Sequence, residues 1–113
     1  MKLETLTAQE VKSLTKEGKW KRFQFYSICY KDATSRKFAF SASRKANNKV
    51  IRNKIKRILR EIIRQNLEFF PTGHFLIVGS TDILNLNFTE LSEMLKKDFQ
   101  DLKKSFPESS FSQ

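Results

Sequence analysis

The lysines and arginines between residues 44 and 64 are the side chains with the clearest chemical potential in this sequence. Nine of them and one acid, Glu61, lie in that window, which leaves +8 of the chain's formal net charge of +10. Charge of this density attracts polyanions, because Lys and Arg donate charge-assisted hydrogen bonds to phosphate oxygens. Asn53 lies amid these cations, and its amide can orient a phosphate or a sugar hydroxyl. The window predicts a nucleic-acid-binding segment.

The same sequence offers little for catalysis by the protein itself. It has a single histidine, His74, a single cysteine, Cys29, and no cluster of carboxylates. Those residues supply neither a set of metal ligands nor a catalytic triad, and a glycine-rich phosphate loop is also missing. His74 precedes an apolar run and Cys29 lies within an aromatic-rich run, so both are predicted to be structural. We therefore expect no catalytic residue and no metal ligand.

The bulk composition favours a single domain that works in the cytoplasm. A chain of 113 residues can bury a core without disulfides, and one cysteine suits a reducing compartment. A pI near 10.0 points to nucleic acid or an anionic membrane as partner. No apolar run approaches the roughly 18 residues of a membrane span, and the first ten residues, MKLETLTAQE, lack an apolar signal core. A membrane partner is not expected.

Periodicity and caps predict the elements that must position the basic segment. They are, in order, a helix from Thr7 to Gly18, strands at 20–30 and 38–43, a helix at 48–66, a strand at 74–79, and a helix from Asn87 to residue 106. A Thr-x-x-Glu capping box begins the first helix. The two strands WKRFQFYSICY and FAFSAS predict an antiparallel hairpin. Residues 1–106 then form one domain, and residues 107–113 form a frayed tail.

The basic helix has two faces. Ile51, Ile55, Ile58 and Ile62 recur at spacings of four, three and four, which is one side of an α-helix, and Asn53 falls with most of the cations roughly opposite them. A solvated surface helix is the plain alternative, but such helices usually mix charges of both signs. The aliphatic face lacks the Trp or Phe of membrane-surface helices. A strand precedes this helix, which disfavours a helix-turn-helix protein that binds DNA.

The element order predicts an α+β fold, a small sheet with helices packed on one face and the other face partly open. The basic segment resembles the protein subunit of bacterial ribonuclease P, whose basic helix carries an Arg-Asn-Arg run after Ser-Lys-Lys and a Gly-Asn turn. The matching residues here are Ser43-Arg44-Lys45, Asn47-Asn48 and Arg52-Asn53-Lys54-Ile55-Lys56-Arg57. The resemblance spans residues 7–106. Lys54 replaces the usual Arg and loses its bidentate fork, and Asn47 replaces the usual Gly, which is consistent with a positive φ.

The resemblance implies a fold with a mixed sheet and a left-handed β-α-β crossover. It implies an accessory subunit of an RNA-based endoribonuclease, a hydrolase, that binds one ribonuclease P RNA and the 5′ leader of precursor tRNA. The RNA performs the cleavage that yields the mature 5′ end, with Mg²⁺ held through the RNA, so the protein alone is expected to bind no cofactor. A DNA partner is not expected. The alternative is a ribosomal or RNA-assembly protein that binds structured RNA without any role in cleavage.

The resemblance also implies two groups of RNA-binding residues. Contact with the catalytic RNA is expected from Ser43, Arg44, Lys45, Asn48, Arg52, Asn53, Lys54, Lys56, Arg57 and Arg60. The leader cleft is expected to include Val11, Thr15, Phe25, Ser27 and Cys29. The family usually has aromatic residues where Val11, Thr15 and Cys29 align, and Phe25 and Ser27 share the face of Cys29 if the strand alternates. A plain core role is the alternative for Phe25.

Overall fold

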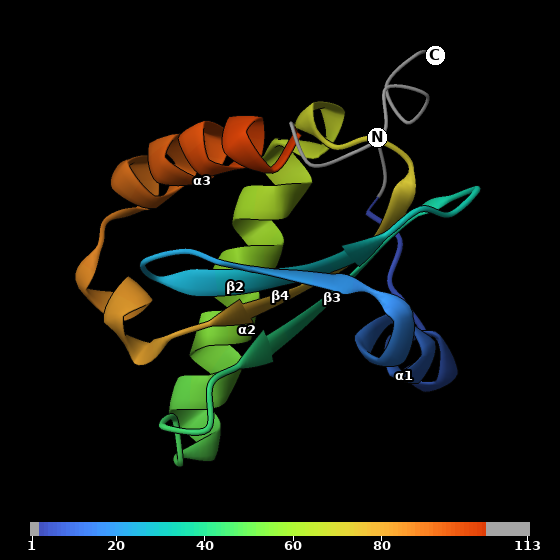
Figure 1. Ribbon diagram of the computed structural model, residues 1–113. Helices are drawn as coiled ribbons and strands as arrows, with labels where there is room; N and C mark the ends of the chain where they lie inside the picture. The colour runs from blue at the N-terminus through green and yellow to red at the C-terminus, as the bar shows by residue number, and fades with distance from the viewer. Residues whose placement is uncertain (1–2, 104–113) are drawn as a thin grey trace.

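The computed structural model describes residues 3–103 of the chain (Figure 1). Its helices and strands are α1 (Ala8–Glu17), β1 (Lys19–Arg22), β2 (Tyr26–Lys31), β3 (Arg36–Ala42), α2 (Lys49–Gln65), β4 (Gly73–Gly79) and α3 (Phe88–Lys103), with short 3-10 helices at Leu67–Phe69 and Thr81–Asn85. The three predicted helices and the strand before α3 are thus confirmed. The predicted tail and the last predicted turn of α3 lie outside the described residues.

The sheet has four strands in the order β1-β2-β4-β3. β2 pairs antiparallel with β1 and with β4, whereas β3 pairs parallel with β4. The predicted strand at 20–30 is therefore two strands joined by a turn, and the predicted hairpin with 38–43 is wrong because β4 lies between β2 and β3. β4 takes the central position because it is apolar. Five of its seven residues are buried, and a strand of this kind belongs in the sheet centre.

The crossover from β3 through α2 to β4 is left-handed (Figure 1). It connects two parallel neighbours and is an exception to the right-handed rule for such units. The mixed sheet and the helices confirm the predicted α+β class.

Helices cover both faces of the sheet, which corrects the expectation that all of them pack on one face. The main core lies between one face and the helices α2 and α3, and includes Phe38, Phe75 and Ile77. A smaller cluster of Leu14, Cys29 and Leu76 lies beneath α1 on the opposite face. Because β4 is apolar on both sides, each of its faces needs a cover. α1 covers only part of its face (Figure 1).

The N-terminal half of α2 lies tightly against the end of β4. A methyl group added at Gly79 would come within 2.8 Å of Ile55 Cγ2 and 3.0 Å of Leu59 Cδ1. A residue with a side chain at this position would push the helix away from the sheet. Gly79 thus fixes the distance between the basic helix and the sheet that carries it.

Candidate nucleic-acid interface

The helix α2 exposes the side chains that the sequence predicts for RNA contact. Within residues 49–64 of α2, the exposed polar residues are Lys49, Arg52, Asn53, Lys54, Lys56, Arg57, Arg60 and Arg64. Ile55, Leu59, Ile62 and Ile63 hold the other side of the helix in the core. The predicted division into an aliphatic and a cationic face is confirmed.

Carboxylates balance very little of this cationic face. Glu61 accepts hydrogen bonds from Arg64 through both of its oxygens, and these bonds hold the pKa of Glu61 below its ordinary value. Within residues 3–103, no carboxylate oxygen lies within 4.0 Å of the charged nitrogens of Arg52, Lys56 or Arg57. The field of these cations is therefore directed at solvent, where a polyanion can reach it.

The loop before α2 adds further cations at the helix N-terminus. The backbone N–H of Ser43 donates to the Gly79 carbonyl, and the N–H of Ala46 donates to the Ser43 carbonyl. Ala46 is buried and anchors the loop, whereas Arg44 and Lys45 are exposed. The loop thus holds both cations beside the first turn of α2.

The two asparagines before α2 differ from each other in role. The side-chain oxygen of Asn48 accepts a hydrogen bond of 2.8 Å from the Val50 N–H, which confirms the predicted cap. Asn47 does not have the expected positive φ. Among the described residues, Gly73 is the one with a positive φ. The N–H of Asn47 donates instead to the Lys45 carbonyl, so the turn closes with ordinary backbone angles.

A hollow of about 590 Å³ joins the two predicted groups of RNA-binding residues. Among its lining residues are Arg22, Phe25, Ser27, Ser43, Arg44 and Lys45, together with the acidic Asp82. Phe25 is half-buried and packs against the main core rather than the α1 cluster, because β2 begins only at Tyr26. Sequence reasoning did not single out Arg22, although it belongs to β1, in which all four residues are exposed and three of them are basic.

The other predicted cleft residues lie under or on α1. Cys29 is 0% exposed, its Sγ donates to the Leu14 carbonyl at 3.5 Å, and burial raises the pKa of its thiol. A direct contact between Cys29 and RNA is therefore excluded in this structure, since α1 covers the side chain. Val11 is half-buried against the same cluster, and Thr15 is exposed with its hydroxyl donating to the Lys12 carbonyl.

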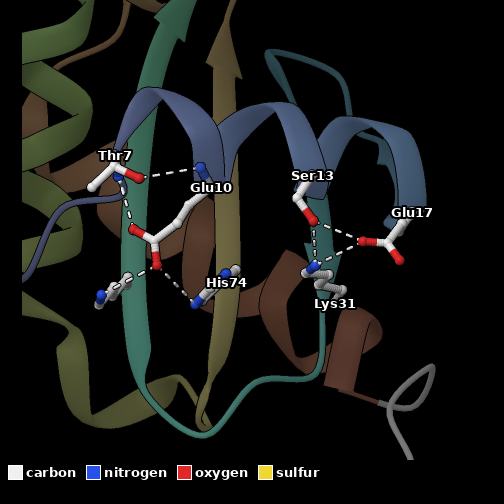
Figure 2. A network of polar contacts seen from close by, with 7 residues as sticks. Thr7, Glu10, Ser13, Glu17, Lys31 and His74 are labelled. Carbon is white, nitrogen blue, oxygen red and sulfur yellow. Dashed lines mark hydrogen bonds and ion pairs between the residues drawn. The ribbon is translucent and has the colours of Figure 1, made fainter.

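A polar network holds α1 on the sheet (Figure 2). Glu10 completes the capping box with Thr7, and its second oxygen accepts a hydrogen bond from Lys37 Nζ at 3.2 Å and lies 3.9 Å from His74 Nε2. Near the other end of α1, Lys31 Nζ lies 2.9 Å from Ser13 Oγ. Burial lowers the pKa of His74, and its Nδ1 is buried without a hydrogen-bond partner.

Replacing Glu10 with glutamine is expected to flatten the acid side of the stability profile. The hydrogen bond from the Thr7 N–H, assisted by Lys37, lowers the pKa of Glu10 below its ordinary value of 4.5. A carboxylate of this kind stabilises the fold fully above its unfolded pKa, and the contribution is lost as pH falls through its folded pKa. Thermal unfolding measured between about pH 3 and pH 7 reports the effect.

The amide oxygen of glutamine at position 10 can still accept from the Thr7 N–H and so keeps the capping box, whereas the charge and the acceptor for Lys37 are removed. Glu93→Gln, which changes an exposed residue of α3, is the matched control. Equal acid profiles for the wild-type protein and Glu10→Gln would contradict the role of the Glu10 charge in holding α1.

The described part of the chain shows neither a metal-binding cluster nor a membrane span. No group of three or more His, Cys, Asp or Glu within residues 3–103 is placed to hold a metal ion. In the same range, no helix combines the length and the apolarity needed to cross a bilayer. What this surface offers is a set of cations, amides and hydroxyls.

The sheet order, the crossover and the exposed basic helix define a fold found in solved ribonuclease P proteins. The ribonuclease P protein from Thermotoga maritima superposes with a TM-score of 0.74 at 21% identity, over 92% of this chain and 98% of that one. The ribonuclease P protein from Staphylococcus aureus gives a TM-score of 0.74 at 16% identity, over 91% and 97%.

Sequence comparison identifies the family. The family model described as Ribonuclease P matches residues 4–103. A ribonuclease P protein component from Geobacter sp. (strain M21) is 37% identical over 76 residues, which cover 67% of this chain and 66% of that relative. The match therefore spans slightly less than two thirds of the relative's length. The chain belongs to the ribonuclease P protein family.

Proposed function

We propose that this chain is the protein subunit of ribonuclease P and that it binds the catalytic RNA and the 5′ leader of precursor tRNA. In this role it assists the endonucleolytic removal of the leader that gives the mature tRNA 5′ end. The observation that carries the proposal is the exposed cationic face of α2, on which Arg52, Lys56 and Arg57 have no carboxylate within 4.0 Å in the described range. Like charges on one helix face repel each other, and RNA phosphates supply the missing anions.

The contact with the catalytic RNA is assigned to the loop before α2 and to the exposed face of α2. Its residues are Ser43, Arg44, Lys45, Asn48, Arg52, Asn53, Lys54, Lys56, Arg57 and Arg60. Arg52 and Arg57 each present a planar fork that matches two phosphate oxygens, whereas Lys54 acts as a point charge. The Asn48 oxygen already caps the helix, so its amide N–H groups are left for RNA. The Arg60 guanidinium lies 5.9 Å from the centre of the Phe40 ring, which supports it.

The leader is assigned to the open part of the α1 face and to the hollow beside it. Ser27 offers a hydroxyl and Phe25 part of its ring, while Arg44 supplies charge from the other wall. Val11 and Thr15 lie at the α1 border of this surface. Cys29 is left out of the proposed contact because it is fully buried.

The RNA is proposed to carry the catalytic groups, with Mg²⁺ bound through RNA phosphates. The protein's part is electrostatic, because cations placed between two RNA molecules reduce the repulsion that magnesium would otherwise have to screen. One protein per catalytic RNA, working in the cytoplasm, completes the proposal.

Reconstitution tests the proposed function. The protein is mixed with a bacterial ribonuclease P RNA and a precursor tRNA at low, near-physiological magnesium, and release of the leader is followed with and without protein. The expected result is that cleavage requires both the RNA and the protein, and that the protein alone releases no leader. Binding to RNA with unchanged cleavage would overturn the proposal and indicate a ribosomal or RNA-assembly protein.

A further inference from the structure

The edge strand β1 presents an exposed aromatic ring among cations. All four of its residues, Lys19, Trp20, Lys21 and Arg22, are exposed, and the strand contains no acid. Trp20 is 52% exposed and is the only tryptophan of the chain. Aromatic rings beside cations are the combination with which proteins bind single-stranded nucleic acid, since every base can stack on a ring. Neither core cluster includes Trp20, so packing does not explain its position.

The strand register places Trp20 on the same side of the sheet as the proposed leader surface. Trp20 lies opposite Cys29 and Arg22 lies opposite Ser27, and directly opposed residues of an antiparallel pair point to the same face. Cys29 faces α1, so Trp20 and Arg22 also lie on the α1 face. Arg22 and Ser27 both line the hollow. The surface is thus continuous from the loop before α2, across the hollow, to Trp20.

We propose that β1 extends the leader-binding surface, with a base of the precursor tRNA leader stacked on Trp20 and the adjoining phosphate bound by Arg22. This inference rests on the proposed function and deepens it. On this path the leader crosses the hollow from the side of Arg44 before it reaches β1. The stacking ring therefore acts on the part of the leader that has already passed the hollow.

The occupant is the leader rather than the catalytic RNA for two reasons. Trp20 faces the α1 side of the sheet, whereas α2 packs against the opposite side. A base must also be unstacked to lie on a tryptophan ring, and bases in RNA helices are already stacked and paired. The leader is a single-stranded part of the proposed substrate that mature tRNA lacks.

The fluorescence of Trp20 tests this inference directly, because it is the only tryptophan. The holoenzyme is assembled from the wild-type protein and ribonuclease P RNA, and then titrated with precursor tRNA or with mature tRNA, which has no leader. Precursor tRNA is expected to change the Trp20 emission and to protect the ring from acrylamide quenching, while mature tRNA does neither. Full protection by the catalytic RNA alone, or equal protection by both tRNAs, would overturn the assignment to the leader.

Variants give the second readout. Trp20→Ala is expected to raise the dissociation constant of the holoenzyme for precursor tRNA by about 5- to 150-fold, the range for one stacked base, with no change for mature tRNA. Trp20→Phe keeps a ring and retains most of the affinity, whereas Trp20→Leu behaves as Trp20→Ala. Phe88→Ala, at a ring on α3 that is 41% exposed, is the matched control with wild-type affinity.

Two measurements keep a failure interpretable. Thermal unfolding of Trp20→Ala is expected to show a folded protein with only a modest loss of stability, because the side chain is half exposed and outside both core clusters. If cleavage still depends on the protein but Trp20→Ala binds precursor tRNA like the wild type, this inference is wrong while the proposed function stands. If the wild-type protein fails to support cleavage at all, the proposed function itself is wrong.

Discussion

Replacing Arg52 and Arg57 together with alanine is expected to weaken binding to ribonuclease P RNA by about two to four orders of magnitude. A hydrogen bond to a charged group contributes about 1.5–3 kcal/mol, so two lost contacts amount to about 3–6 kcal/mol, or tenfold for each 1.4 kcal/mol. Both side chains are exposed and project from a helix held by Ile55 and Leu59. Because the change also removes like-charge repulsion on the helix, the fold is expected to be no less stable.

Binding measured over a range of salt concentrations checks this prediction. Each lost phosphate contact lowers the magnitude of the slope of log K against log salt by about 0.7–0.9, so the double variant loses about 1.4–1.8 from that slope. Lys96→Ala with Lys97→Ala on α3 is the control, because it removes the same charge from exposed positions on another helix. Equal losses for both double variants would show that net charge alone, rather than the α2 face, governs binding.

Replacing Ile55 with alanine is expected to reduce the free energy of unfolding by about 2–5 kcal/mol, as for other buried aliphatic residues. Ile55 is 0% exposed on the core side of α2 and its Cγ2 approaches Gly79 closely. A cavity here would loosen the part of α2 that carries Arg52 and Arg57. Unfolding in urea, followed by far-ultraviolet circular dichroism, gives the change in free energy.

Val50→Ala is the matched control for Ile55→Ala, since both shorten a β-branched residue of α2. Val50 is 74% exposed, and a surface change of this kind stays within about 0.5 kcal/mol. If the two variants lost similar stability, the assignment of the two faces of α2 would be wrong.

The basic helix was predictable because all of its information is local. The isoleucine spacing fixes the period, Asn48 provides the cap, and the aliphatic side chains determine which face is left for Arg52 and Asn53. The predicted contact residues of α2 and its preceding loop are therefore exposed, except Ser43, which is half-buried.

The strand order was not predictable from local patterns. An aromatic-rich segment followed by FAFSAS favours a hairpin, but the more apolar β4 displaces β3 from β2 and takes the centre of the sheet. That outcome depends on pairings between residues 37 to 53 positions apart in the chain, which local propensity does not report. The turn that divides residues 20–30 into β1 and β2 places Trp20 and Arg22 in β1, at the edge of the sheet.

The environment of α1 was equally non-local. The capping box revealed Glu10 and Thr7, but not that Lys37 and His74 would lie beneath the helix, because β3 and β4 come together under it only in the folded sheet. The burial of Cys29 has the same origin, since it depends on α1 packing over β2 through Leu14.

Directed cleavage of the catalytic RNA from a probe on α2 tests the central claim most directly. A single cysteine is introduced by Lys56→Cys, or on α3 by Lys97→Cys as the control, and an iron chelate that generates hydroxyl radicals is attached to it. The native Cys29 is fully buried, and burial raises its pKa, so it does not compete for the reagent. We predict strong, localised cuts in ribonuclease P RNA from position 56 and few from position 97. Cuts of equal strength from both positions, or from position 97 alone, would contradict the claim that the exposed face of α2 binds the RNA.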